Sequence, residues 1–367
     1  MAFIQNMGLL SVTPGMLGMW LIGLTLIYLA IKKQYEPLLL LPIGFGILLA
    51  NLPNTDLMTE GQGLIWRFYH YGIEWEIFPP LIFLGLGALT DFGPLLSQPR
   101  LIFLGAGAQV GVYITFFAAY AMGFTLQEAA TIGIIGGADG PTTIYLASKL
   151  APQLLGVVAV AAYSYMALVP IIQPPIMRLL TTEKERKIRM HKGRKITHKE
   201  KLFFPVVATV VIILLVPPSA PLMAMFMLGN LFRESKVVER LSDTAQNALL
   251  NIVTIFLGVS VGATMDAATF FNRDVIFIFV LGLFAFMLST ASGILLAKLM
   301  NLFTSNKVNP LIGAAGVSAV PMAARVAQKM ATAADKKNYI IMFAMGPNIA
   351  GVIGTLIAAG VFLTMLK

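Results

Sequence analysis

Long apolar stretches, interrupted mainly by glycine and proline, dominate this chain of 367 residues. Hydrophobic residues make up 57% of it and charged residues only 12%, whereas a typical soluble domain has about 25% charged residues. A bilayer offers no hydrogen-bond partners, so the backbone must pair its polar groups within each crossing segment. Runs such as "VVATVVIILLV" (206–216) lack the alternation of β-barrel strands. The sequence therefore predicts an all-α polytopic membrane protein.

Charge is concentrated between two apolar halves. Ten Lys or Arg residues and three Glu residues lie between Arg178 and Lys201, in a chain with a formal net charge of +9. A basic loop on a membrane protein is most often a cytoplasmic orientation signal. We therefore interpret residues 181–201 as a cytoplasmic loop that joins an N-terminal membrane repeat, 1–180, to a C-terminal one, 202–367. Nucleic acid is not expected as a partner, although an anionic protein could use the loop.

The first residues and the rare residue types narrow the possibilities further. The start, "MAFIQNMGLLSVTPGMLG", lacks the charged region of a cleaved signal and is broken at Thr13-Pro14-Gly15. We expect residues 1–15 to form a partial membrane segment. The absence of cysteine excludes disulfides, thiolate metal sites and cysteine nucleophiles. Two of the three histidines lie in the basic loop, which disfavours an imidazole metal site within the membrane.

The two halves share a weak internal repeat. Three blocks align in the same order at nearly one offset: "PIGFGILLANL" (42–52) with "PLMAMFMLGNL" (221–231), "FLGLGALTDFGPLL" (83–96) with "FLGVSVGATMDAATFF" (256–271), and "GIIGGADGPTTIYLASK" (133–149) with "GAAGVSAVPMAARVAQK" (313–329). Low-complexity Gly/Ala similarity is the alternative explanation. If residues 129–148 dip into the membrane and return, the first half crosses it five times, an odd number, and the distribution of basic residues agrees with this count. We therefore expect two inverted-topology repeats.

One carboxylate lies in the strongest block of the repeat. Asp139 stands among glycines and before Pro141, in a segment that should break a helix. A carboxylate at the centre of a membrane helix costs about 2.5–3.5 kcal/mol, so Asp139 should face water, a cation or a proton path. Oxygen ligands at a broken helix suit Na⁺ or a competing proton. The alternative is an aspartate that caps a helix at the surface.

The second broken segment lacks this acid, because Ala319 aligns with Asp139. It offers other groups to a shared cation site near the midplane: Asn309, Gly313, Ser318 and Arg325. Arg325 is either the counter-ion of Asp139 or a bidentate ligand for an anionic substrate. Whether the segments 129–148 and 308–329 are re-entrant hairpins or broken spans is left open.

Further candidates come from the last spans of each half. Asn348 follows Pro347 in "MGPNIAG" (345–351), where a helix is again broken. Tyr165 lies in the segment of the first half that corresponds, in the repeat, to the segment with Asn348. It could be a ligand, a proton donor or a packed aromatic. Asp91 and Asp266 are related by the repeat, and we expect them to cap helices or gate rather than bind ions.

Four stretches together resemble one known family, the membrane β subunit of the biotin-dependent, sodium-pumping decarboxylases. They are "GGADGPT" (136–142), "GNLFRESKVVERLSDTAQNALLNIVTIFLG" (229–258), "NPLIGAAGVSAVPMAARVAQ" (309–328) and "MGPNIAGVIG" (345–354). The resemblance covers nearly the whole chain. Members act on oxaloacetate, methylmalonyl-CoA, glutaconyl-CoA or malonate, and the short length of this chain slightly favours the acyl-CoA members.

The resemblance implies a mechanism and a set of site residues. Carboxybiotin on a partner protein is decarboxylated at this subunit, which consumes an external proton and exports Na⁺. By motif match, Asp139 is the essential acid, which binds Na⁺ and exchanges a proton. The other Na⁺ positions are Asn309, Gly313, Ser318 and Asn348. Tyr165 matches a tyrosine near the site, and Arg325 matches an arginine that handles protons or carboxybiotin.

The resemblance also implies partners. The chain contains no Ala-Met-Lys-Met biotin attachment sequence, since "AQKMA" (327–331) lacks the first methionine, so biotin would be supplied in trans. The expected partners are a carboxyltransferase subunit, a biotin carrier protein and a small membrane subunit, with a homo-oligomer of this subunit. The expected location is the cytoplasmic membrane of a bacterium or archaeon.

Two other functions remain as alternatives at this stage. A stand-alone secondary transporter, such as a Na⁺/H⁺ antiporter or a Na⁺-coupled carboxylate carrier, would also have inverted repeats and broken segments. An inactive scaffold subunit is disfavoured by the intramembrane Asp139 and Arg325.

Overall fold

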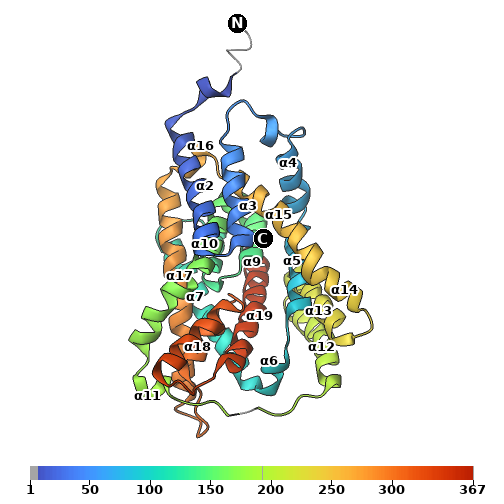
Figure 1. Cartoon of the computed structure of the whole chain (residues 1–367), viewed down its shortest axis with the longest axis vertical. Coiled ribbons are helices and arrows are strands. Elements are labelled where there is room, and N and C mark those ends of the chain that lie inside the picture. Colours follow the sequence, from blue (N-terminus) through green and yellow to red (C-terminus); the bar gives the residue numbers. More distant parts are fainter. Residues whose placement is uncertain (1–6, 192, 367) are drawn as a thin grey trace.

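The computed structural model describes residues 7–191 and 193–366, which are mainly helical and include no β-strand (Figure 1). The predicted all-α class is therefore confirmed. Residues 1–6 of the expected N-terminal partial segment, together with Lys192 and Lys367, lie outside the described part. Within that segment, Gly8–Ser11 form one 3₁₀ turn, η1, and the first long helix begins at Pro14 behind the Thr13 cap.

The N-terminal half contains nine α-helices and, after η1, five shorter 3₁₀ or π turns among the described residues. They are α2 (Pro14–Lys33), α3 (Pro37–Ala50), η2 (Asp56–Met58), α4 (Leu64–Tyr69), η3 (His70–Glu74), α5 (Phe78–Leu89), α6 (Gly93–Ser97), η4 (Pro99–Leu101), α7 (Ile102–Ala121), α8 (Leu126–Gly133), η5 (Ile134–Gly137), α9 (Gly140–Leu150), η6 (Pro152–Leu154) and α10 (Leu155–Leu180), with η1 counted above.

The basic loop contains one short helix, and the C-terminal half repeats the order of long helices. The elements are α11 (Glu183–Arg186), α12 (His198–Leu215), η7 (Pro217–Ser219), α13 (Ala220–Ser235), α14 (Glu239–Thr244), η8 (Ala245–Leu249), α15 (Leu250–Ala263), α16 (Ala267–Phe270), α17 (Arg273–Met300), η9 (Pro310–Gly316), α18 (Met322–Ala334) and α19 (Ile341–Leu366).

Six segments of the described chain are long and apolar enough to cross a membrane. They are Pro14–Lys33, Pro99–Ala121, Pro152–Leu180, Glu239–Ala263, Arg273–Met300 and Ile341–Leu366. A bent pair, Leu64–Glu74 with Phe78–Leu89, makes a seventh if it counts as one span, and α3 is apolar but shorter. The expectation of several short or broken segments is therefore met.

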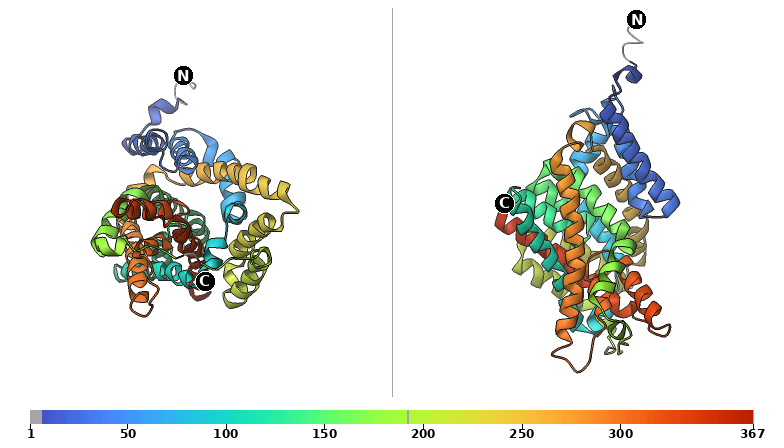
Figure 2. Two further views of the ribbon diagram at one scale, coloured as in Figure 1. Left: turned by 60° about the horizontal axis from the view of Figure 1, so that its bottom comes forward. Right: turned by 90° about the vertical axis from the view of Figure 1, so that its left-hand side faces the viewer.

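The helices fall into two groups in space (Figure 2, left). The core bundle consists of α7, α10, α17 and α19 with the two broken segments, and the flanking helices are α2, α3, α5, α12, α13 and α15. Within the flank, α3 packs on α15 and α5 packs on α13, while α7 packs on α17 in the core. By the sequence alignment α3 corresponds to α13, α5 to α15 and α7 to α17, so the contacts of α3 with α15 and of α5 with α13 are related crosswise. The inverted relation itself stays a prediction.

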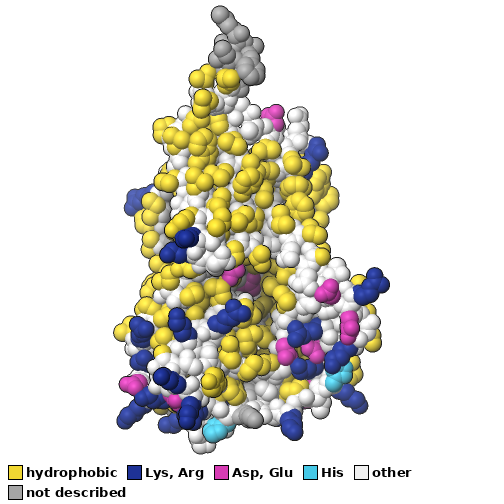
Figure 3. Space-filling view, viewed as in Figure 1, with side chains coloured by type: hydrophobic (Ala, Val, Ile, Leu, Met, Phe, Trp, Pro, Cys, Tyr) yellow, Lys and Arg dark blue, Asp and Glu magenta, His cyan; other side chains and the backbone are white. Residues whose placement is uncertain are grey.

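The loop 181–201 lies against both halves. Arg194 N–H donates to the Ser97 carbonyl, and Gln98 Nε2 donates to the His191 carbonyl at 2.6 Å. Arg189 forms an ion pair with Asp335 at 2.8 Å. The loop therefore forms an ordered part of the basic end of the molecule (Figure 3).

Candidate functional site

The first broken segment places Asp139 at the start of a buried helix. After η5 ends at Gly137, Ala138 takes a left-handed conformation with φ of 54°, and the chain re-enters a helix behind the Asp139 cap. Asp139 Oδ1 accepts from Thr142 N–H at 3.2 Å, and the residue is only 5% exposed. Asp139 does cap a helix, as the alternative reading had it, but that helix end is buried.

The second broken segment touches the first at its break. Ser318 N–H donates to the Gly137 carbonyl at 2.8 Å, which joins the two segments two residues before Asp139. Ser318 Oγ lies 2.8 Å from Thr355 Oγ1 on α19. Asn348 Nδ2, also on α19, donates to the Val317 carbonyl at 2.6 Å. The expected meeting of the two broken segments is therefore observed as a direct contact.

Three oxygens around this meeting point lack a hydrogen-bond partner in the described structure. They are Asp139 Oδ2, Thr142 Oγ1 and Asn348 Oδ1, all buried. Buried polar atoms are normally paired, so each exception calls for an explanation such as an ion or water. A carboxylate, a hydroxyl and an amide oxygen are hard ligands of the kind that bind cations such as Na⁺. The donor set therefore fits a small hard cation.

Tyr163 packs closely beside Asp139, and sequence reasoning did not select it. A Cβ on Gly140 would lie 2.0 Å from the Tyr163 ring, so only glycine fits there. The Tyr163 hydroxyl is buried without a hydrogen-bond partner among the described residues and lies within electrostatic range of Asp139 and Glu36. The only signal in the sequence was the pair of tyrosines in "AAYSYMALVP".

Tyr165, the tyrosine chosen from sequence, points elsewhere. Residues two apart on a helix are separated by about 200°, so Tyr163 and Tyr165 occupy different faces of α10. The Tyr165 hydroxyl donates to the Phe279 carbonyl on α17, and the residue is 6% exposed. It therefore links the two long helices α10 and α17 of the core.

Arg325 lies on α18 and is exposed. Its charge interacts with that of Glu36, which precedes α3 in a left-handed conformation and is half-buried. On the face viewed in Figure 3, acidic side chains lie in a recess between the apolar upper part and the basic lower part. In the described structure, Glu36 rather than Asp139 is the carboxylate identified as an electrostatic neighbour of Arg325.

Asn309 and Gly313 shape the second broken segment at some distance from the break. Asn309 Nδ2 donates to the Arg186 and Ile188 carbonyls at 3.0 and 2.8 Å, which ties η9 to the basic loop. A Cβ on Gly313 would lie 2.1 Å from the Gly293 carbonyl oxygen, so glycine permits close packing on α17. At roughly 2 Å per residue of 3₁₀ helix, Asn309 lies about 14 Å along η9 from its far end. The structure brings Asp139, Ser318 and Asn348 together but places Asn309 apart from them.

Of the two repeat-related aspartates, Asp266 caps the short helix α16, as expected, whereas Asp91 precedes Phe92, the N-cap of α6. Asp91 Oδ1 accepts from Gly93 N–H and from Lys201 Nζ, at 2.8 and 2.7 Å, and Asp266 Oδ1 accepts from Ala268 N–H. Partial burial tends to raise the pKa of Asp91, but the hydrogen bonds from Lys201 and Gly93, with the charges of Lys201 and Arg233, lower it overall. Asp91 therefore links the end of α5 to the start of α12.

Comparison with known proteins decides the family. The model of the Na⁺-transporting oxaloacetate decarboxylase beta subunit matches residues 15–366. The chain belongs to this family. It is a β subunit of the Na⁺-transporting decarboxylases and an integral membrane protein, and the resemblance stated from its motifs is confirmed.

Individual relatives match along almost their whole length. The chain is 58% identical to the methylmalonyl-CoA decarboxylase subunit beta of Veillonella parvula over 364 residues, covering 99% of this chain and 96% of the relative. It is 56% identical to the glutaconyl-CoA decarboxylase subunit beta of Acidaminococcus fermentans, with the same coverage. Identity to the oxaloacetate decarboxylase beta chain of Klebsiella pneumoniae is 51% over 422 residues, covering 99% and 98%.

Proposed function

We propose that this subunit decarboxylates carboxybiotin delivered by a partner protein and couples that step to Na⁺ export and uptake of an external proton. The observation that carries the proposal is the contact between the two breaks, Ser318 N–H to the Gly137 carbonyl. Beside this contact lie the unpaired oxygens of Asp139 and Asn348. A cation site at the junction of two broken segments is the arrangement expected of an ion translocator.

The chemistry requires a proton. The carbamate C–N bond of carboxybiotin breaks, CO₂ leaves, and the electron pair stays on the biotin nitrogen, which takes up one proton. Asp139 is proposed to hold Na⁺ when ionised and to carry a proton when Na⁺ has left. Protonation of Asp139 removes the negative charge that holds Na⁺, so each proton bound by this carboxylate displaces one Na⁺.

The remaining residues are assigned by their surroundings. Arg325 is exposed on α18 and is proposed to hold the anionic carbamate by paired hydrogen bonds. Tyr165, the candidate catalytic tyrosine of the sequence, is proposed instead to be a positioning residue that acts through the contact between α10 and α17. Ser318 and Asn348 are proposed as Na⁺ ligands beside Asp139. Asn309 and Gly313 are proposed to contribute by shaping η9 and the ion path along it.

Partners and substrate follow from the same proposal. The basic loop 181–201 is proposed to be cytoplasmic and to receive the carboxyltransferase and biotin carrier, because it is ordered and carries exposed cations. A small membrane subunit and further copies of this chain would complete the complex. We favour an acyl-CoA as the acid, since the acyl-CoA relatives cited align over about this chain's own length and the oxaloacetate relative needs 422 positions.

Reconstitution separates this function from that of a stand-alone carrier. In proteoliposomes that contain the chain and a carboxylated biotin carrier protein, CO₂ release should require Na⁺ and drive ²²Na⁺ transport. Arg325→Ala should raise the carrier concentration at half-maximal rate by at least about tenfold, because a charged hydrogen bond is worth about 1.5–3 kcal/mol. Lys337→Ala, at another exposed basic residue, is the control.

A different result would reject the proposal. If the chain exchanged Na⁺ across the bilayer at full rate without any biotin species, and released no CO₂ from the carboxylated carrier, it would act as a secondary transporter. An unchanged half-saturation in Arg325→Ala would remove Arg325 from carbamate binding while leaving the decarboxylase assignment intact.

A further inference from the structure

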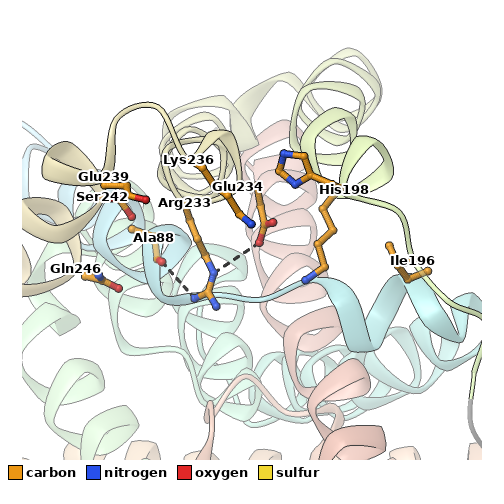
Figure 4. Close-up of a pocket in the computed structure, with 10 residues that line it drawn as sticks. Ala88, Ile196, His198, Arg233, Glu234, Lys236, Glu239, Ser242 and Gln246 are labelled. Atoms are coloured by element: carbon orange, nitrogen blue, oxygen red, sulfur yellow. Dashed lines mark hydrogen bonds and ion pairs between the residues drawn. The ribbon is translucent and has the colours of Figure 1, made fainter.

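A pocket lies at the basic end of the flanking helices, away from the contact between the two breaks. Its volume is about 790 Å³, within the roughly 300–1,000 Å³ typical of small-molecule sites. Side chains from α12, α13 and α14 converge on it, with Glu239 on one side and His198 on the other (Figure 4). Its residues Ile196, His198 and Lys201 belong to the proposed docking loop, but the proposed chemistry at the junction uses none of the pocket's residues.

The pocket has both signs of charge. Its cationic residues are Lys201, Arg233 and Lys236, and its acids are Glu234 and Glu239. Arg233 Nη1 donates to the Leu89 carbonyl at 2.7 Å and its Nε lies 3.6 Å from Glu234. Lys201 is paired with Asp91.

Two charges are left for a ligand. Among the described residues, neither Lys236 nor Glu239 has an ion pair or a side-chain hydrogen bond, and both are exposed. A simple anion would meet two carboxylates in this pocket, and a simple cation would meet three basic groups. A ligand that carries a phosphate and an ammonium group satisfies both.

The surroundings point to a membrane lipid as the source of that ligand. The helix α12 begins at His198, and one turn further its outer face is apolar and exposed, with Phe203 62%, Val207 56% and Val210 53% accessible. Beside Glu239, Leu241 is 53% exposed. In a membrane protein such faces meet acyl chains, so the pocket lies where the headgroup of an adjoining lipid would be. Charged pockets between helices at this level bind lipid headgroups.

We infer that this pocket binds the headgroup of an aminophospholipid, with its phosphate on Lys236 and Arg233 and its primary ammonium on Glu239. Lys236 supplies an unpaired ammonium, and Arg233 keeps a second guanidinium nitrogen for the phosphate. Glu239 accepts from the headgroup N–H groups. A trimethylated headgroup offers no N–H to that carboxylate, and a glycerol headgroup offers no cation.

Native mass spectrometry of the delipidated full-length chain tests the inference. Phosphatidylethanolamine, phosphatidylcholine and phosphatidylglycerol with identical acyl chains are added separately at equal concentration. We expect phosphatidylethanolamine to be bound at least about tenfold more than either of the others, because one additional hydrogen bond to a charged group is worth about 1.5–3 kcal/mol. The double variant Lys236→Ala/Glu239→Gln should lose this preference, and Lys337→Ala should keep it.

Several results would overturn the inference. Equal binding of the three lipids, or a double variant that keeps the preference, would show that this pocket does not recognise the headgroup. Tighter binding of phosphatidylglycerol would make the pocket a plain anion site. Loss of bound phosphatidylethanolamine on adding a soluble subunit of the complex would assign the pocket to a protein partner. Size-exclusion chromatography of each variant confirms that it is folded, and none of these outcomes depends on decarboxylase activity.

Discussion

The two broken segments share one pattern but differ in chemistry. In the first, Asp139 caps the re-entry helix and keeps one carboxylate oxygen unpaired. In the second, Pro321 stands at the helix start without a side-chain cap, and Ser318 supplies a hydroxyl and the backbone N–H that reaches Gly137. Each segment contributes one helix break to the junction, and the carboxylate comes from the first segment.

The two segments also place their charged residues, Arg325 and Asp139, in different surroundings. Arg325 belongs to the second segment and is exposed, with Glu36 of the flanking helices as its electrostatic neighbour. Asp139 belongs to the first segment and is buried against Tyr163. The two groups that looked like one ion pair in the sequence therefore have different neighbours, which favours Arg325 as a substrate ligand over Arg325 as the counter-ion of Asp139.

The largest expected effect comes from removing the acid. Asp139→Asn should lower Na⁺-dependent decarboxylation at least about 100-fold, the usual scale for losing an acid–base group. Moving the acid across the junction, in Asp139→Ala/Ala319→Asp, should not restore activity, because Ala319 lacks the Thr142 N–H that holds the carboxylate. CO₂ release by the reconstituted complex measures both. Full activity of Asp139→Asn would show that the acid of the first segment is not needed for decarboxylation.

The next effect concerns the fit between Gly140 and Tyr163. Gly140→Ala places a Cβ 2.0 Å from the Tyr163 ring, and overpacking of this kind costs about 1–3 kcal/mol. We expect a thermal midpoint several degrees lower and a large loss of activity. Gly346→Ala is the matched control, since its nearest non-local atoms lie at 3.5 Å. Equal behaviour of the two variants would mean that Tyr163 moves aside freely.

The second segment should contribute to Na⁺ affinity more than to the maximal rate. Ser318→Ala removes one oxygen from the junction, so the Na⁺ concentration at half-maximal decarboxylation should rise about tenfold, which corresponds to about 1.4 kcal/mol. Ser292→Ala, whose hydroxyl bonds only the Ser289 carbonyl in the described structure, should leave it unchanged. A fall in maximal rate with unchanged Na⁺ dependence would place Ser318 in the chemistry instead.

The smallest effect lies at the basic end, outside the junction. The pKa of Asp91 is lowered in the folded chain, so its pair with Lys201 contributes fully above the ordinary value of 3.8 and is lost as the pH falls through the lower folded value. The Asp91 side chain is 39% exposed, which limits the contribution to about 1 kcal/mol. Asp91→Asn should lower the thermal midpoint slightly at pH 7 and by less at pH 3. If the change in thermal midpoint were the same at pH 7 and at pH 3, the effect of Asp91→Asn would come from packing and not from charge.

The sequence by itself determined the class and the breaks. Apolar runs require helices because lipid cannot satisfy the backbone, and the glycines and proline around Asp139 end a helix through local backbone preferences that no distant residue is needed to set. The motifs pointed to the family that the match over residues 15–366 then confirmed. All of this depends on neighbours in the chain, so it can be read without coordinates.

The tertiary structure decided which side chains meet. Tyr163 rather than Tyr165 packs on the Asp139 turn, Asn309 binds the basic loop, and Arg325 has Glu36 as an electrostatic neighbour. Each of these depends on how one helix is rotated against another, and a rotation of about 100° per residue changes the partner completely. The pocket between α12, α13 and α14 arises in the same way, since its charged residues come from three helices whose spacing only packing sets.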